Sequence, residues 1–253
     1  MTLNPQFIGL ATVLFFGGLI FIFAAMARRK GAKPRGIRPI EAYESLPAAV
    51  GAAVETGRRI HISLGSGAIG EASTAATISG LSVLDQVASV AAISDKPPIV
   101  TTADGTAMFL AQDTLRGVYN RQNASEQYDP LSAQVAGLSP LGFGVALTGL
   151  LKDEAVAGTV LIGSVGQEVV LLTEAGQRAK VTTVAGSDLP AAQAVLFATA
   201  DQPLIGEDLF AGNAYINRRP AHLASLRAQD WMRVIIGIVI VIGVVLKTFG
   251  VLP

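Results

Sequence analysis

Two long apolar segments lie near the two ends of this chain, and they limit its fold more than any other feature. The first, residues 7–27, reads FIGLATVLFFGGLIFIFAAMA and contains no charged residue. About 20 apolar residues in a helix cross the ~30 Å hydrocarbon core of a bilayer. A secretory signal peptide is the competing interpretation, but it would carry positive charge before the apolar run, whereas here the positive charges follow it. We therefore expect a transmembrane helix over residues 1–27.

The second segment, residues 231–249, reads WMRVIIGIVIVIGVVLKTF. Trp231 suits the aromatic belt at a membrane interface, and the long side chain of Arg233 can extend to the aqueous side. The uncharged core of this segment is short, so a crossing would also use the residues after it. A buried core helix is the alternative, but Ile and Val residues without a polar face fit lipid better. We expect a second transmembrane helix and a short tail over residues 227–253.

Basic residues next to the first segment predict the orientation. Residues 28–38 contain Arg28, Arg29, Lys30, Lys33, Arg35 and Arg38, and no acid precedes Glu41. Such segments stay in the cytoplasm, so this basic linker and the domain expected over residues 39–226 would be cytoplasmic, with both termini outside. The sequence thus predicts a two-span protein of the inner or plasma membrane. Arg28, Arg29, Lys30, Trp231 and Arg233 are the expected membrane-anchoring residues.

Composition limits the chemistry that is open to the chain. The spans carry no charged residue or histidine in their middle, which disfavours a transporter or channel made by one chain. The net charge is zero, which gives no reason to expect nucleic acid as a partner. The absence of cysteine excludes disulfides and thiolate catalysis. The only histidines are His61 and His222, and no metal-binding or P-loop pattern occurs, so we expect no metal site.

Strand-like and helix-like segments alternate between the two apolar runs. Strands are expected at residues 59–64, 99–102, 158–163 and 181–184, with 167–173 ambiguous between strand and helix. Helices are expected at residues 39–57, 71–92, 106–120 and 139–153, and Asp188 is expected to cap a further helix through Phe197. This alternation predicts an α/β domain with a Rossmann-like, mainly parallel sheet and helices on both faces.

A glycine pattern lies at the first expected strand-to-helix turn. Residues 65–70 read GSGAIG, which matches the G-x-G-x-x-G of dinucleotide-binding turns. In those turns the glycines allow a tight bend and a close approach of pyrophosphate to a helix N-terminus. An acid, Asp104, follows the second expected strand. This interpretation assigns Gly65, Ser66, Gly67, Gly70 and Asp104 to a site for NAD or another nucleotide.

Three observations favour a purely structural turn without a cofactor. Glu71 lies in the first turn of the expected helix, where a carboxylate would repel phosphate. Asp104 lies much farther along the chain than the ~20 residues usual for this acid. Tight strand-to-helix turns also need glycine whether or not a ligand is bound. A small anion at the backbone of residues 66–68 is a third alternative.

No set of catalytic residues stands out elsewhere. His61, Ser63, Asp85 and Asp104 could be drawn as a Ser-His-Asp set, but they match no known motif. We expect His61 to be a half-buried strand residue. The sequence therefore predicts no catalytic residue.

The segments GRRIHISLGSGAIGEASTAATISGLSVLDQVA and TLRGVYNRQN resemble an uncharacterised family of bacterial two-span membrane proteins with a domain of unknown function. The resemblance covers about residues 37–250. It implies a membrane-anchored cytoplasmic domain and assembly into large rings, but no activity or cofactor. Together with the featureless spans and the small residues of GAIGEASTAATISGL, it favours a scaffold that homo-oligomerises in the bilayer through its α/β domain. The alternatives are a membrane-tethered nucleotide-binding protein and an accessory subunit bound to other membrane proteins.

Overall fold

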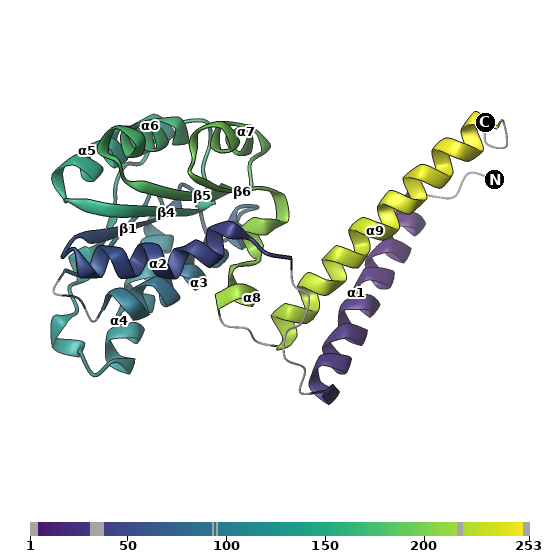
Figure 1. Ribbon diagram of the computed structural model, residues 1–253, viewed down its shortest axis with the longest axis horizontal. Coiled ribbons are helices and arrows are strands. Elements are labelled where there is room, and N and C mark those ends of the chain that lie inside the picture. The colour runs from purple at the N-terminus through teal and green to yellow at the C-terminus, as the bar shows by residue number, and fades with distance from the viewer. Residues whose placement is uncertain (1–4, 31–37, 93, 95, 217–219, 250–253) are drawn as a thin grey trace. The chain divides into compact units, whose positions relative to one another are not determined.

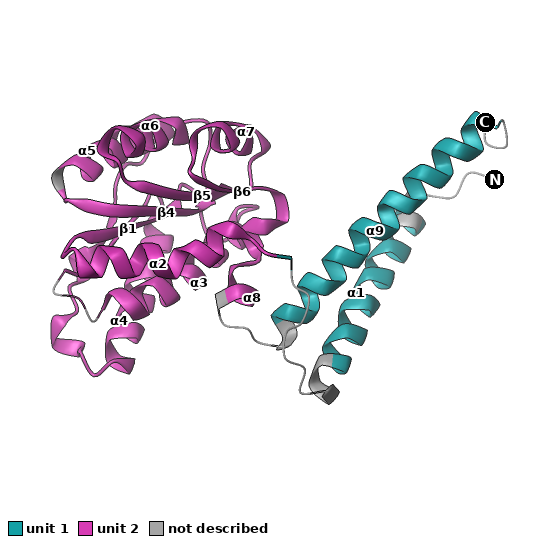
Figure 2. Cartoon of the chain, viewed as in Figure 1, with its two compact units in different colours: residues 1–38, 217–253 teal, residues 39–216 magenta. Residues whose placement is uncertain are grey.

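The computed structural model describes residues 5–30, 38–92, 94, 96–216 and 220–249. The chain forms two compact units (Figure 2): residues Pro39–Ile216 make one, and the terminal segments Met1–Arg38 and Asn217–Pro253 together make the other. The sequence places the end of the α/β domain at residue 226, whereas the compact unit ends ten residues earlier, at Ile216.

Two long helices make up the terminal unit. They are α1, Pro5–Lys30, and α9, Pro220–Thr248, and they pack against each other in antiparallel directions (Figure 1). Both are long and apolar enough to cross a membrane, over Gly9–Met26 and His222–Thr248. Most of their large apolar side chains are exposed, but Leu223, Ala224 and Ala228 at the start of α9 are buried. The expectation of two flanking apolar helices is confirmed.

A six-stranded parallel sheet forms the centre of the other unit. Its strands are β1 (Arg59–Gly65), β2 (Ile99–Thr102), β3 (Ala133–Val135), β4 (Val156–Ser164), β5 (Thr182–Ser187) and β6 (Gln202–Leu204). Their spatial order is β3-β2-β1-β4-β5-β6, and every neighbouring pair is parallel. The direction of winding reverses between β1 and β4, as it does in the doubly wound Rossmann fold. The predicted fold class is confirmed.

Helices cover both faces of this sheet (Figure 1). One layer contains α2 (Glu41–Glu55), α3 (Thr74–Ala91), α4 (Gly105–Arg121) and the short α8 (Gly212–Ile216). The other contains α5 (Pro140–Asp153), α6 (Val169–Ala179) and α7 (Pro190–Thr199). Three 3-10 turns, η1 (Ser125–Gln127), η2 (Pro130–Ser132) and η3 (Gly206–Phe210), lie in the connections. Because both faces are covered, β1 and β4 are buried almost throughout. β4 contains the apolar run Val160–Ile162, whereas β1 alternates apolar residues with His61 and Ser63, which are buried as well.

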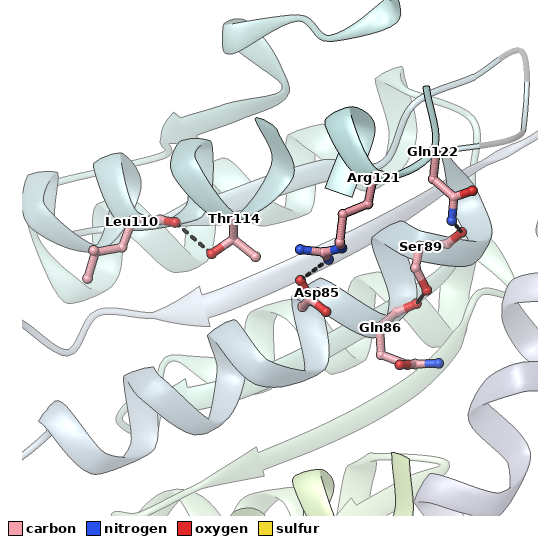
Figure 3. Close-up of polar contacts among 7 residues, drawn as sticks. All are labelled: Asp85, Gln86, Ser89, Leu110, Thr114, Arg121 and Gln122. Atoms are coloured by element: carbon pink, nitrogen blue, oxygen red, sulfur yellow. Dashed lines mark hydrogen bonds and ion pairs between the residues drawn. The ribbon is translucent and has the colours of Figure 1, made fainter. Parts of the chain in front are cut away.

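The small residues of α3 let this helix lie directly on the sheet. A Cβ atom at Gly80 would be 2.1 Å from the carbonyl oxygen of Ile162 on β4, so no larger residue fits there. Polar contacts then join α3 to α4 (Figure 3). Arg121 pairs with Asp85, and Gln122 donates to the Ser89 carbonyl over 3.3 Å. The segment GAIGEASTAATISGL is thus used, at least at Gly80, for packing within the domain.

The structure differs from the sequence interpretation in several elements. The edge strands β3 and β6 were not expected, because three residues are too few to show a period of two. Of the ambiguous segment 167–173, residues 169–173 belong to helix α6. The assignment of Asp188 as a helix cap was wrong: Leu189 holds the N-cap position, with Pro190 starting α7, and Asp188 Oδ1 is buried without a hydrogen-bond partner. Proline is favoured in the first helical turn, which explains this start.

Candidate functional site

The glycine turn lies where this fold most often binds ligands. Strands β1 and β4 end side by side at the carboxyl edge of the sheet, and the winding direction reverses between them. In open α/β sheets, ligands bind in the crevice outside this point. Residues 65–70 follow β1 there, and residues 164–168 follow β4. The G-x-G-x-x-G turn therefore lies between a strand and a helix, as expected. The contacts of its residues determine whether a ligand can bind there.

Gly65 forms a tight junction between the two strands. Its φ angle is +75°, and an added Cβ atom would be 2.2 Å from the Ser164 carbonyl oxygen. The backbone N–H of Ser66 donates to the same oxygen over 2.7 Å. The Gly65 carbonyl accepts from Ala103 N over 3.0 Å and from Thr102 Oγ1 over 3.2 Å. The first glycine thus makes the tight turn and joins the ends of β1, β2 and β4.

The second glycine, Gly67, is enclosed by the protein itself. It is buried, and a Cβ atom there would be 2.7 Å from Ser73 Cβ and 2.8 Å from Ser164 Cβ. Thr77 Oγ1 donates to the Gly67 carbonyl over 3.2 Å, and Ser73 Oγ donates to the Ala68 carbonyl over 3.0 Å. In dinucleotide-binding turns this glycine leaves space for pyrophosphate. Here two serine side chains lie against it.

An additional turn separates the third glycine from helix α3. The helix begins at Thr74, three residues later than the sequence predicts. Gly70, with a φ angle of +99°, donates its N–H to Thr74 Oγ1 over 2.9 Å, and this hydroxyl donates to the Glu71 carbonyl over 2.6 Å. Gly70 and Glu71 are exposed. A phosphate at this helix end would therefore meet the Glu71 carboxylate, which disfavours its binding.

Asp104 caps helix α4. Its Oδ1 accepts from Ala107 N over 2.8 Å, and the residue is partly buried. The structure brings Asp104 to the same edge as the glycine turn, because β2 lies next to β1. The backbone connects them through the bond from Ala103 N to the Gly65 carbonyl. The carboxylate therefore already has a structural role, whereas a nucleotide-binding role would direct it to a ribose hydroxyl.

Acidic residues follow four of the strands at this edge. They are Glu71, Asp104, Glu168 and Asp188, after β1, β2, β4 and β5, and the connections that contain them have no lysine or arginine. Glu168 Oε1 accepts from Gly166 N over 2.9 Å. The edge therefore has a negative potential, which opposes binding of an anionic ligand. The sequence has one acid after each of these strands, and this pattern could have predicted the acidic edge. It becomes visible only once the four strands are known to end at the same edge of the sheet.

His61 lies in the middle of β1 and is fully buried, not half-buried as expected. Its Nδ1 lies 2.7 Å from Thr159 Oγ1 on β4, and its Nε2 lies 2.9 Å from Thr101 Oγ1 on β2. Burial lowers the pKa of His61 to about 3, so the ring is neutral. Since Asp85 pairs with Arg121 and both ring nitrogens contact threonines, His61 and Asp85 form no Ser-His-Asp set.

The remaining candidate residues lie on the two long helices. Among the residues that the structure describes, no three of His, Asp or Glu lie close enough together to hold a metal ion. Arg28, Arg29 and Lys30 are the last three residues of α1. On α9, Trp231 is 55% exposed and Arg233 is exposed as well. Asp230, Trp231 and Val234 line a hollow of about 160 Å³.

Comparison with known proteins shows the family but no function. The domain of unknown function DUF6754 matches residues 4–252, nearly the whole chain, so the protein belongs to this family. No curated protein and no solved structure is significantly similar to it.

Proposed function

We propose that this DUF6754 protein is an integral membrane scaffold that assembles with further copies of itself and is not an enzyme. The main observation against an enzyme is the closed turn at the carboxyl edge of the sheet. Gly67, which would face a dinucleotide, is enclosed by Ser73 and Ser164. Catalysis needs a binding space with converging polar groups. The chain's own contacts occupy this place in the fold.

In this proposal α1 and α9 both cross the inner or plasma membrane of a bacterium. The basic residues that follow α1 and precede α9 favour a cytoplasmic α/β domain and external termini. The antiparallel packing of the two helices supports a pair of crossings with both ends on the same side. The natural chain has no cysteine, so single cysteines report topology cleanly. Cysteine at Leu131, which is 80% exposed, should react with a membrane-impermeant maleimide only in inverted vesicles.

The size of the extracted protein tests the scaffold. We expect an oligomer when membranes are dissolved in a mild detergent and the particle mass is measured by light scattering after size exclusion. Large symmetric particles in electron micrographs would support a ring. A monomer at micromolar concentration in several mild detergents would contradict the proposal. Stoichiometric co-purification of a different membrane protein would favour an accessory subunit instead.

A nucleotide-binding role is the second candidate, because the strand order and the G-x-G-x-x-G position are those of dinucleotide-binding folds. Calorimetric titration of the full chain with NAD, NADP, FAD and ATP tests it. Binding below about 1 mM would support this candidate, and its absence for all four would remove it. Gly67→Val is unsuitable as a binding-deficient variant, since the new side chain would collide with Ser73 and Ser164 and disturb the fold.

A further inference from the structure

The two helix layers that cover the sheet differ in charge. Helices α2, α3 and α4 with the turn η3 carry seven acids and two bases, whereas α5, α6 and α7 carry two acids and two bases. The whole unit, residues 39–216, carries eighteen acids and eight bases, a net charge of −10. The α5–α6–α7 layer is therefore the side without net charge of a strongly acidic domain.

Large apolar side chains are exposed along α5. Leu141 and Val145 are 67% and 56% exposed, and their spacing of four residues places them on one side of the helix. Leu138, just before the helix, is 87% exposed. Leu138 directly precedes the N-cap Ser139, a position from which an apolar side chain often packs back onto the helix. Here Leu138 remains in solvent while Phe143 is fully buried. We call Leu138, Leu141 and Val145 the α5 face.

Helix α7 exposes a second apolar face in the same layer. Its sequence, PAAQAVLFAT, has no charged residue. Phe197 is 75% exposed and Leu189, just before the helix, is 43% exposed, with small exposed alanines between them. We call Leu189, Ala191, Ala194, Phe197 and Ala198 the α7 face. Between α5 and α7 lies α6 (Figure 1), with Val170 exposed near its start and a Glu174–Arg178 ion pair near its end.

The charges of the molecule restrict what can cover these faces. Helices that lie on a lipid surface carry basic residues beside their apolar side, but the α5 and α7 faces have none. An anionic surface would also repel a domain of charge −10. A basic partner would need an excess of acids here, but the helices of this layer carry as many bases as acids. A neutral apolar surface fits, and a second copy provides the same one.

We propose that the outer side of the α5–α6–α7 layer is the contact between two copies of this protein. The inference rests on the proposed homo-oligomeric scaffold and names its interface. Two domains of like charge repel each other, so they approach best through the side that has no net charge. Since the same layer serves on both copies, the contact has two-fold symmetry. Larger assemblies then need a second contact in addition to this one.

A matched pair of charge insertions tests the proposal in the full-length chain. Leu141 on α5 and Phe109 on α4 are 67% and 66% exposed, each near the start of its helix, but on opposite layers. We expect Leu141→Asp to weaken self-association at least tenfold, measured as the midpoint of dissociation on dilution, and Phe109→Asp to leave it within twofold. Thermal unfolding should be alike for both variants, since neither residue is buried.

The outcomes separate the interface from the scaffold. If the wild type is monomeric, the proposed function fails and the interface fails with it. If the wild type is oligomeric but Leu141→Asp does not weaken it, or Phe109→Asp weakens it equally, only the interface proposal is overturned. Single cysteines give a second measurement: Val170→Cys should form a disulfide-linked dimer on mild oxidation in membranes. Equal dimer formation by Phe109→Cys would contradict the proposal.

Discussion

The two compact units of this protein carry opposite charge. Residues 39–216 have a net charge of −10, whereas the terminal segments, residues 1–38 and 217–253, contain eleven bases and one acid and have a net charge of +10. The zero net charge of the chain is the sum of these two values. Whole-chain charge therefore says nothing about either unit. The acidic unit tends to stay in water, and the basic flanks suit an anionic membrane surface.

Large apolar side chains are buried in the α/β unit and mostly exposed on the two long helices of the terminal unit. Leu172 and Leu196 of the α/β unit are fully buried, whereas Val239 and Ile240 on α9 are 62% and 60% exposed. In water, exposure of so many large apolar residues would be strongly unfavourable, and burial stabilises them by about 1.5–3 kcal/mol each. In lipid no such cost arises. With α1 and α9 in lipid, as proposed, the two units would follow different packing rules, and substitutions of the same type should have different effects in them.

Replacement of a helical glycine by alanine should give the largest difference in stability change between the two units. Gly80→Ala on α3 puts a Cβ atom 2.1 Å from the Ile162 carbonyl, so the helix must move away from the sheet. We expect the free energy of unfolding of the α/β unit to fall by about 3 kcal/mol or more. Gly237→Ala on α9 meets no atom within 4 Å and should not destabilise either unit. Thermal unfolding followed by near-ultraviolet circular dichroism measures both, and equal effects would contradict the difference in packing.

Acid should destabilise the α/β unit through His61. The pKa of His61 is about 3 in the folded state and ~6.5 when unfolded, so the unfolded state binds the proton more strongly. Stability is complete above pH ~6.5 and falls as the pH drops from there towards 3, by up to ~1.4 kcal/mol per pH unit. Between pH 6.5 and 4.5 the expected loss from this residue is about 2 kcal/mol.

The variant His61→Gln isolates this effect from those of the carboxylates. Glutamine can also contact Thr101 and Thr159, but it does not titrate. We expect a lower stability at neutral pH and a shallower loss between pH 6.5 and 4.5, measured by urea unfolding at each pH. The helical signal of α1 and α9 in detergent should remain while the α/β unit unfolds. An unchanged pH dependence in the variant would show that His61 is not the group responsible.

The sequence predicted the long elements and missed the features that depend on neighbours. Strand β2 was predicted at its observed bounds, because Ile99 to Thr102 follow a proline pair and precede an acid. The edge strands β3 and β6 were missed, since they exist only through pairing with β2 and β5. At the candidate site the position of the glycine turn was predicted correctly. Its closure by Ser164 was not, since Ser164 is 97 residues beyond Gly67 in sequence.

Removal of the Tyr43 hydroxyl should moderately lower the stability of the α/β unit and leave the terminal unit unchanged. This buried tyrosine on α2 stacks on Tyr215 of α8 with ring centroids 5.6 Å apart, and its hydroxyl lies 3.0 Å and 3.1 Å from the carbonyl oxygens of Asp208 and Leu209. Burial and the nearby charge of Asp208 raise its pKa, so the hydroxyl remains a donor. Tyr43→Phe should lower the free energy of unfolding by ~1–2 kcal/mol. Tyr128→Phe, which removes a less buried bond to Gln112, should have a smaller effect, and the reverse order would contradict this assignment.

A single surface ion pair should have the smallest effect, although the charge of the whole unit is large. Arg178 and Glu174 on α6 form an i,i+4 pair, with side chains 76% and 55% exposed. Such exposed pairs contribute only ~0.3–0.5 kcal/mol, because water screens them. Glu174→Gln should therefore change unfolding by less than ~0.5 kcal/mol, and 0.5 M salt should reduce the difference further. A loss above 1 kcal/mol in the dissociated protein would show that α6 depends on this pair. If the loss appears only in the assembled protein, Glu174 contributes to the contact between copies, because individual charges matter more where a second copy excludes water.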